Sequence, residues 1–226
     1  SIRAAEAVKI VENAFRDVNI AFVNELAQSF DQMGIDVTEV IHGAATKPFA
    51  FLAHAPGAGV GGHCIPVDPY YLIEHAQARG FDHRFLRLAR EINASMPRYT
   101  VERLKRARGS ADLRGVRVAI LGLAYKRDIA DLRESPALEI EKILRAEGAE
   151  VVSFDPFVPE KSTTSSLKDA LTVADAVVLA TDHTVFKKLA PEDLAKTPVR
   201  VIVDGRNCLD HEAFRDKGYT IVGIGK

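Results

Sequence analysis

The sequence predicts an α/β protein in which an all-helical region precedes a doubly wound parallel sheet. Two observations carry this prediction. In the first half of the chain, apolar residues recur at intervals of three and four, as they do on one face of a helix. From Leu113 onward, short runs rich in Val and Ile alternate with helical patterns, which is typical of parallel strands joined by crossover helices.

The helical region is predicted to open with one long helix from Arg3 to Met33 that ends at Gly34. A helix of about thirty residues is roughly 45 Å long, which is more than a small domain needs. We therefore expect it to form the interface of a homodimer. Further helices are expected over residues 36–43, 69–79 and 82–108, with Asp36 and Asp68 as N-caps and a break or kink at Pro97.

The second region contains five predicted strands and four predicted helices. The strands cover residues 116–121, 150–154, 176–180, 199–204 and 219–223, and the helices cover residues 136–146, 166–173, 185–189 and 211–217. We place the domain boundary near Ser110, which gives a helical domain over residues 1–110 and a sheet domain over residues 111–226. In such sheets, ligands bind beyond the carboxyl ends of the strands.

The composition argues against several classes of function. The 226 residues include 30 Lys and Arg against 31 Asp and Glu, so no surplus of positive charge points to nucleic acid. No apolar run approaches the length of about eighteen residues that a membrane span needs. The two cysteines, Cys64 and Cys208, predict no disulfide and favour a reducing, cytoplasmic setting. Scattered histidines and the lack of CxxC and HExxH patterns give no support to a metal site.

A glycine-rich loop dominates the helical region. Gly57, Gly59, Gly61 and Gly62 lead into Cys64. Glycines leave no side chain between the backbone and a ligand, so the loop is suited to present N–H groups to an anion or a sugar. The cysteine lies just before a predicted helix, whose dipole favours the thiolate over the thiol.

The same glycines match the spacing of the dinucleotide-binding fingerprint, but we reject that interpretation. The fingerprint needs a preceding strand and a helix that starts at the third glycine. Residues 44–55 do not form a convincing strand pattern, and Pro66 and Pro69 follow the loop. We therefore interpret the loop as a substrate site.

The loop also carries a family resemblance. Together with Lys47-Pro48-Phe49, the segment from Pro56 to Tyr71 resembles the active-site segment of the UDP-sugar 6-dehydrogenases, most of all the UDP-N-acetylglucosamine branch. Further motifs extend the resemblance over nearly the whole chain, at residues 5–13, 122–136 and 204–207. The resemblance implies that a primary alcohol is oxidised to a carboxylate with two NAD⁺.

The resemblance assigns four catalytic residues. Cys64 would be the nucleophile that forms a thiohemiacetal and then a thioester. Lys9 and Asn13 would stabilise negative charge on the substrate oxygen, and Asp68 would position or deprotonate water. By spacing alone, Lys9 and Asn13 are as well explained as exposed residues on one helical face, and Asp68 as an N-cap.

Three cations follow predicted strands. Lys126, Arg133 and Arg206 suit phosphates, although surface cations are also common by chance. The resemblance implies that Lys126 and Arg206 contact the UDP-sugar and that Arg133 reaches the NAD pyrophosphate. It also implies that Gly57, Gly59 and Gly61 line the substrate site.

Members of this family carry an N-terminal NAD domain, and this chain begins almost directly at the helix bearing Lys9. We therefore expect a helical dimerisation domain and a Rossmann-like UDP-sugar-binding domain without dehydrogenase activity of their own. UDP-N-acetylmannosamine and UDP-glucose remain alternative substrates. A non-catalytic nucleotide-sugar-binding and dimerisation module is the alternative from another class, and a thiol hydrolase is a third that lacks a plausible base.

Overall fold

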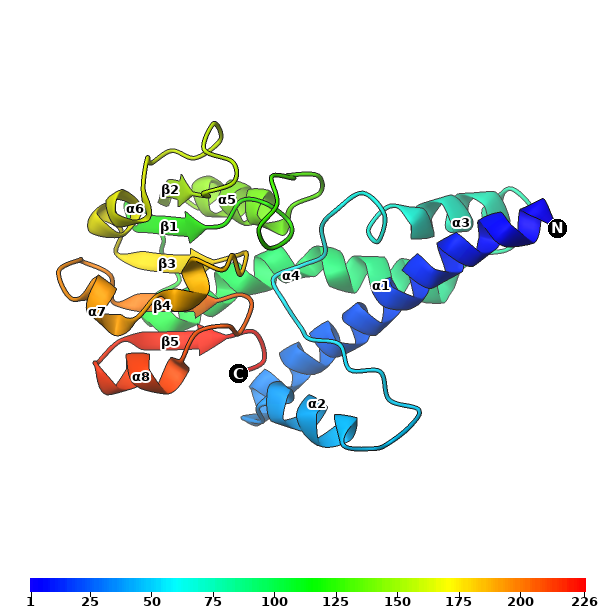
Figure 1. Ribbon diagram of the computed structural model, residues 1–226, viewed down its shortest axis with the longest axis horizontal. Coiled ribbons are helices and arrows are strands. Elements are labelled where there is room, and N and C mark those ends of the chain that lie inside the picture. Colours follow the sequence, from blue (N-terminus) through cyan, green and yellow to red (C-terminus); the bar gives the residue numbers. More distant parts are fainter.

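The computed structural model describes residues 1–226 as an assembly of helices joined to a five-stranded parallel sheet (Figure 1). The first helices are α1 (Ile2–Met33), α2 (Val37–Ala45), α3 (Asp68–Gln77) and α4 (Arg84–Arg108). The strands are β1 (Arg117–Leu121), β2 (Glu150–Phe154), β3 (Ala176–Leu179), β4 (Val201–Asp204) and β5 (Thr220–Gly223). Between them lie α5 (Pro136–Ala146), α6 (Leu167–Val173), the 3₁₀ helix η1 (Phe186–Lys188), α7 (Pro191–Leu194) and α8 (His211–Asp216). The predicted fold class is confirmed.

Local sequence explains the ends of the longest helix. The Ser1 hydroxyl accepts a hydrogen bond from the Ala4 N–H at the start of α1. At the other end, Gly34 adopts a left-handed conformation with φ of 69°, which glycine takes at little cost. Gly109 ends α4 in the same way, with φ of 66°.

The sheet has the order β2-β1-β3-β4-β5 and carries helices on both faces. On one face, Val118 and Ile120 of β1 pack with residues of α4 and α5, such as Leu104. On the other face, Ala119 and Leu121 pack with residues of α6, η1, α7 and α8. Because successive side chains of a strand point to opposite faces, the Val- and Ile-rich runs fill both cores.

Helix α4 links the two parts of the molecule (Figure 1). It contacts α1 from Arg90 to Arg106, and its second half also covers the sheet. Of the break or kink predicted at Pro97, the break is wrong, since α4 runs through this buried residue, and the kink stays a prediction. Residues of α4 belong both to the core under the sheet and to the core shared with α1 and α2. A domain boundary near Ser110 therefore stays a prediction.

Residues 223–226 return from the sheet to the helices. Ile224 is buried among α1, α2 and α4, and the Gly225 carbonyl accepts the N–H of Val37, the first residue of α2. Arg103 of α4 donates from Nε to the Gly223 carbonyl at 3.2 Å. The helices and the sheet therefore share a core as well as a connecting segment.

Helix α7 is absent from the predicted elements, because its four residues are too few to show a period. None of the helices combines the length and the apolar character that a membrane crossing requires.

Candidate functional site

The loops that follow β1, β3 and β4 gather at the carboxyl edge of the sheet, and the cysteine loop, residues 56–67, lies against them (Figure 1). The Ala58 N–H donates to the Gly205 carbonyl at 3.2 Å, and the Gly62 N–H donates to the Arg133 carbonyl at 2.8 Å. Both contacts join the helical region to a loop that follows a strand. The structure thus brings together segments that sequence analysis singled out separately.

The glycines of the cysteine loop are used for close packing on the protein itself. A Cβ on Gly61 would lie 2.5 Å from the Tyr125 Cβ, and Gly59, with φ of 136°, leaves no room for a side chain against the start of α5. The Gly57 N–H donates to the buried Asn24 Oδ1 at 3.0 Å. That N–H group is therefore not presented to a ligand, which corrects our expectation for Gly57. Substrate contact by the three glycines stays a prediction.

The candidate nucleophile is accessible. The side chain of Cys64 is exposed. Its carbonyl accepts hydrogen bonds from the N–H groups of Val67 at 3.2 Å and Asp68 at 2.8 Å, which form the turn into α3. The thiol thus lies one turn before a helix, as predicted, and its role as a nucleophile stays a prediction.

Two of the other three candidate catalytic residues meet. The buried Asn13 of α1 donates from Nδ2 to Asp68 Oδ2 at 2.5 Å. Asp68 is consequently not the N-cap that we predicted, since its carboxylate faces α1; Val67 occupies the cap position without a side-chain bond. Lys9 is exposed one turn earlier on α1, and its Nζ lies 3.7 Å from Glu12.

The predicted UDP-sugar cations lie at the edge of the sheet. Lys126 is exposed in the loop after β1. The Nε of Arg206 lies 3.4 Å from Asp182 Oδ1, and a Cβ on Gly57 would lie 3.2 Å from its Nη1. Sequence reasoning missed Arg127, which donates from Nε to Asp182 Oδ2 at 2.9 Å. Its position directly after Lys126 was the available signal.

Arg133, the candidate contact to NAD, is exposed and holds a neighbouring carboxylate. Its Nε lies 3.0 Å from Asp131 Oδ1 and its Nη2 lies 2.6 Å from Oδ2. Hydrogen bonds from this guanidinium lower the pKa of Asp131 below its usual range. Exposed ion pairs of this kind contribute little free energy, so an anionic ligand can replace Asp131 at small cost.

The acid at the crevice of the sheet is turned inward. Asp155 follows β2, where doubly wound sheets place the acid that binds a dinucleotide ribose. Here its Oδ2 accepts the N–H groups of Leu123 and Ala124 and lies 3.0 Å from His183 Nε2. Because His183 Nδ1 accepts the Asp128 N–H, the proton resides on Nε2. Asp155 is therefore fully engaged inside the protein.

The protonation of Asp155 follows from these contacts. Burial raises the pKa of its carboxyl, but the hydrogen bonds from His183 and from backbone N–H groups outweigh it, and the pKa falls to about 2. The carboxylate stays ionised and keeps the loop after β1 in place. No three His, Cys, Asp or Glu side chains are grouped as they would be around a metal ion.

A buried polar network supports the cysteine loop from the helical side. Arg90 of α4 donates from Nη1 to Asp17 Oδ1 of α1 at 2.5 Å, and Asn93 Nδ2 donates to the same oxygen at 2.8 Å. Asn24 Nδ2 donates to Asn93 Oδ1 at 2.9 Å, while its own oxygen holds Gly57. All four side chains are buried. The network links an internal ion pair to the first glycine of the loop.

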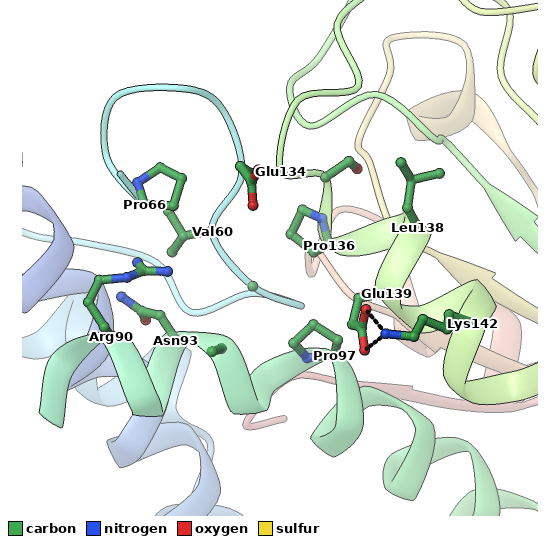
Figure 2. Close-up of a pocket in the computed structure, with 13 residues that line it drawn as sticks. Val60, Pro66, Arg90, Asn93, Pro97, Glu134, Pro136, Leu138, Glu139 and Lys142 are labelled. Atoms are coloured by element: carbon green, nitrogen blue, oxygen red, sulfur yellow. Dashed lines mark hydrogen bonds and ion pairs between the residues drawn. The ribbon is translucent and has the colours of Figure 1, made fainter. Parts of the chain in front are cut away.

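A cavity of about 620 Å³ lies beside this network (Figure 2). Figure 2 shows Val60 and Pro66 of the cysteine loop, Arg90 and Pro97 of α4, and Pro136 at the start of α5 around it. Of the predicted site residues, only Gly59 lines this space. The cavity therefore adjoins the cysteine loop without containing the candidate catalytic side chains.

Comparison with known proteins gives the family. The models of two domains of the UDP-glucose/GDP-mannose dehydrogenase family match this chain, the central domain over residues 3–95 and the UDP binding domain over residues 119–211. A UDP-N-acetyl-D-mannosamine dehydrogenase of Pyrococcus horikoshii is 42% identical over 225 residues. That match covers 98% of this chain and 52% of the relative, so the chain spans about half the length of the relatives it matches.

Two solved structures of similar dehydrogenases have the same fold as this chain. A UDP-D-ManNAc dehydrogenase from Pyrococcus horikoshii superposes with a TM-score of 0.87 at 40% identity and covers 98% of this chain and 52% of its own. An NDP-N-acetyl-D-galactosaminuronic acid dehydrogenase from Methanosarcina mazei gives 0.90 at 33% identity, with 99% and 51% covered. The fold, the loop at the sheet edge and these matches lead to one conclusion: the chain belongs to the UDP-glucose/GDP-mannose dehydrogenase family.

Proposed function

We propose that this chain forms the UDP-sugar-binding and cysteine-bearing half of an NAD-dependent UDP-sugar 6-dehydrogenase. The observation that carries the proposal is the docking of the cysteine loop on the sheet edge, where Gly57 lies against Arg206. The loop that bears Cys64 thus lies against the loops that bear Lys126 and Arg206, and we infer that one substrate reaches all three. Lys126 and Arg206 would bind the diphosphate, because cationic side chains make the strongest hydrogen bonds to phosphate oxygens.

In this proposal, the residues of the chain act on the sugar end of the substrate. The Cys64 thiolate adds to the C6 aldehyde carbon to give a thiohemiacetal, and NAD⁺, when bound, would accept the hydrides whose loss gives first the aldehyde and then the thioester. Asn13 and Lys9 stabilise the resulting oxygen, and the Asp68 carboxylate, held by Asn13, orients the water that later releases the acid. Arg133 is the one residue that we assign to NAD, so we expect no turnover by this chain alone.

The substrate we propose is a UDP-N-acetylhexosamine. The names of the similar proteins contain N-acetylmannosamine and N-acetylgalactosaminuronic acid, and none of those reported above supports the N-acetylglucosamine that the sequence predicts. We therefore rank UDP-N-acetylmannosamine first. Both cysteines are free, which fits the reducing, cytoplasmic setting that we include in the proposal.

Replacing Lys126 by alanine is the direct test of the diphosphate site. The Lys126→Ala change is expected to weaken binding of UDP and of UDP-N-acetylmannosamine by roughly 10- to 100-fold, the worth of one hydrogen bond to a charged group. Isothermal titration calorimetry of the 226-residue chain measures both constants.

Lys217→Ala is the matched control, because Lys217 is exposed at the end of α8, at the opposite edge of the sheet. It is expected to leave both constants unchanged. Equal effects of the two lysine changes, or no UDP binding by the unaltered chain, would contradict the proposed site.

We also propose a homodimer that forms through α1. Apolar side chains lie exposed on this helix at intervals of three, four and seven, namely Val8 (64%), Val11 (57%), Phe15 (52%) and Phe22 (53%). An exposed apolar stripe of this kind marks an interaction surface. Phe15→Glu is expected to shift the chain to monomer in sedimentation velocity experiments, whereas Phe49→Glu, at a still more exposed position outside α1, is not. A dimer that survives Phe15→Glu would place the interface elsewhere.

A further inference from the structure

Asp182 is a buried carboxylate at the edge of the sheet that the proposed chemistry leaves without a role. It follows β3 in the segment Thr181-Asp182-His183 and is 6% exposed. A buried ionised group is costly unless it is paired. Here it is paired twice, by one guanidinium from the loop after β1 and one from the loop after β4.

The two arginines use Asp182 differently. Arg127 donates from both Nε and Nη2 to Asp182 Oδ2, and its Nε also lies 3.0 Å from the Asp182 carbonyl. This pairing raises the pKa of Arg127. Arg127 is thus directed at Asp182, so we do not include it with the adjacent Lys126 in the proposed phosphate site.

Arg206 approaches the other carboxylate oxygen from its Nε side. Nε lies 3.4 Å from Asp182 Oδ1, while Nη1 faces the cysteine loop at Gly57. The Arg206 N–H is held by Asp204 Oδ1 at 3.1 Å. Backbone and guanidinium of Arg206 are therefore both contacted by carboxylates, and Nη1 is turned toward the cysteine loop, beside which we propose that the diphosphate binds.

Charge alone argues against a carboxylate in this place. A negative charge beside a diphosphate site repels the ligand, so a carboxylate there weakens binding unless it does something else. Without Asp182, however, the two guanidinium groups would repel each other and Arg206 would lose its orientation. If Asp182 orients Arg206, removal of its charge weakens ligand binding. If Asp182 only repels the ligand, the same removal tightens binding.

We propose that Asp182 is a positioning residue for nucleotide-sugar binding, which sets the direction of the Arg206 guanidinium and holds Arg127 away from the ligand. This inference rests on the proposed function. Asp182→Asn, which keeps the shape of the side chain, is expected to weaken UDP binding by roughly 5- to 30-fold, even though it removes a negative charge from the site.

A double-mutant cycle separates positioning from general damage. In an Arg206→Ala background, Asp182→Asn is expected to leave UDP affinity unchanged or to increase it, because only repulsion then remains. The matched control is Asp175→Asn, which removes a carboxylate from the exposed Arg117 pair at the amino edge of the sheet and is expected to leave UDP affinity unchanged. Calorimetry with UDP measures affinity, and thermal unfolding shows that each variant folds.

Tighter UDP binding by Asp182→Asn in both backgrounds would show that Asp182 only repels the ligand, and an equal loss in both would show that it does not act through Arg206. Either result overturns the inference alone, whereas absence of UDP binding by the unaltered chain overturns the proposed function as well. If Asp182→Asn does not fold, Arg127→Gln is the test: an effect within about threefold supports positioning by Asp182, and a loss as large as that of Arg206→Ala overturns it.

Discussion

Replacing Arg90 by leucine is expected to lower the free energy of unfolding by about 3–5 kcal/mol, because the change leaves the Asp17 carboxylate buried without its cation. Asp17 is 1% exposed, and its Oδ2 has no hydrogen-bond partner even in the intact protein. Asn93 still donates to Oδ1, but an amide cannot neutralise a charge. Urea denaturation at pH 7, followed by circular dichroism, measures the loss.

The double variant Asp17→Asn/Arg90→Leu is the control, since asparagine keeps an acceptor for Asn93 and buries no charge. It is expected to recover most of the lost stability. A double variant as unstable as Arg90→Leu would show that the packing of the Arg90 side chain, which lies over the Tyr70 ring, matters more than its charge.

The loss in Arg90→Leu should also depend on pH. Burial raises the pKa of Asp17, and the charge of Arg90 opposes this shift, so the change raises the pKa further. For an acid whose pKa is higher in the folded than in the unfolded state, stability is greatest below the unfolded value and falls as the pH rises through the folded value. The destabilisation is therefore expected to be smaller near pH 4 than at pH 7, and a loss independent of pH would contradict the charge argument.

Alkylation is expected to distinguish the two cysteines by orders of magnitude. Cys208 is half-buried, and burial, together with the charge of Asp204, raises the pKa of its thiol to about 12. At pH 8 roughly one Cys208 in 10⁴ is then a thiolate, the form that reacts. Cys64 is exposed, so iodoacetamide should modify it alone, as peptide mass spectrometry can show.

UDP-N-acetylmannosamine is expected to slow this labelling, because the proposed site places the sugar beside Cys64. Cys64→Ser should abolish rapid labelling while leaving UDP binding intact. Rapid modification of both cysteines in folded protein would contradict the burial of Cys208. Labelling of Cys64 that the nucleotide sugar does not slow would favour the alternative of a non-catalytic binding module.

Sequence alone predicts elements whose signals are local. The ends of α1 follow from Gly34 and from the apolar period, and α5 and β2 match their predicted ranges because Pro136 and Gly148 mark them. The helix-capping role predicted for Asp68 is wrong, because a contact with Asn13, distant in sequence, competes for the carboxylate. Local propensity does not contain that contact.

The sequence predicts which residues form the candidate site better than it predicts the contacts that hold them in place. The cysteine loop and the cations of the sheet edge stand out as motifs, and the structure places both at one edge of the sheet. The links from Asn24 to Gly57 and from Asp182 to Arg206 join residues far apart in sequence, and isolated Asn and Asp residues carry no pattern. Only the folded arrangement shows which polar residues hold the motifs in place.

The return of residues 224 and 225 into the helices has a consequence for the order of folding. Ile224 completes a core that α1 and α2 begin, and Gly225 receives the first N–H of α2. Helices α1 and α2 therefore cannot close this core until the segment that follows β5 has left the ribosome. Contacts between segments so distant in sequence slow folding and leave apolar surface exposed meanwhile. Translation must therefore pass the whole sheet before the core of α1 and α2 is complete.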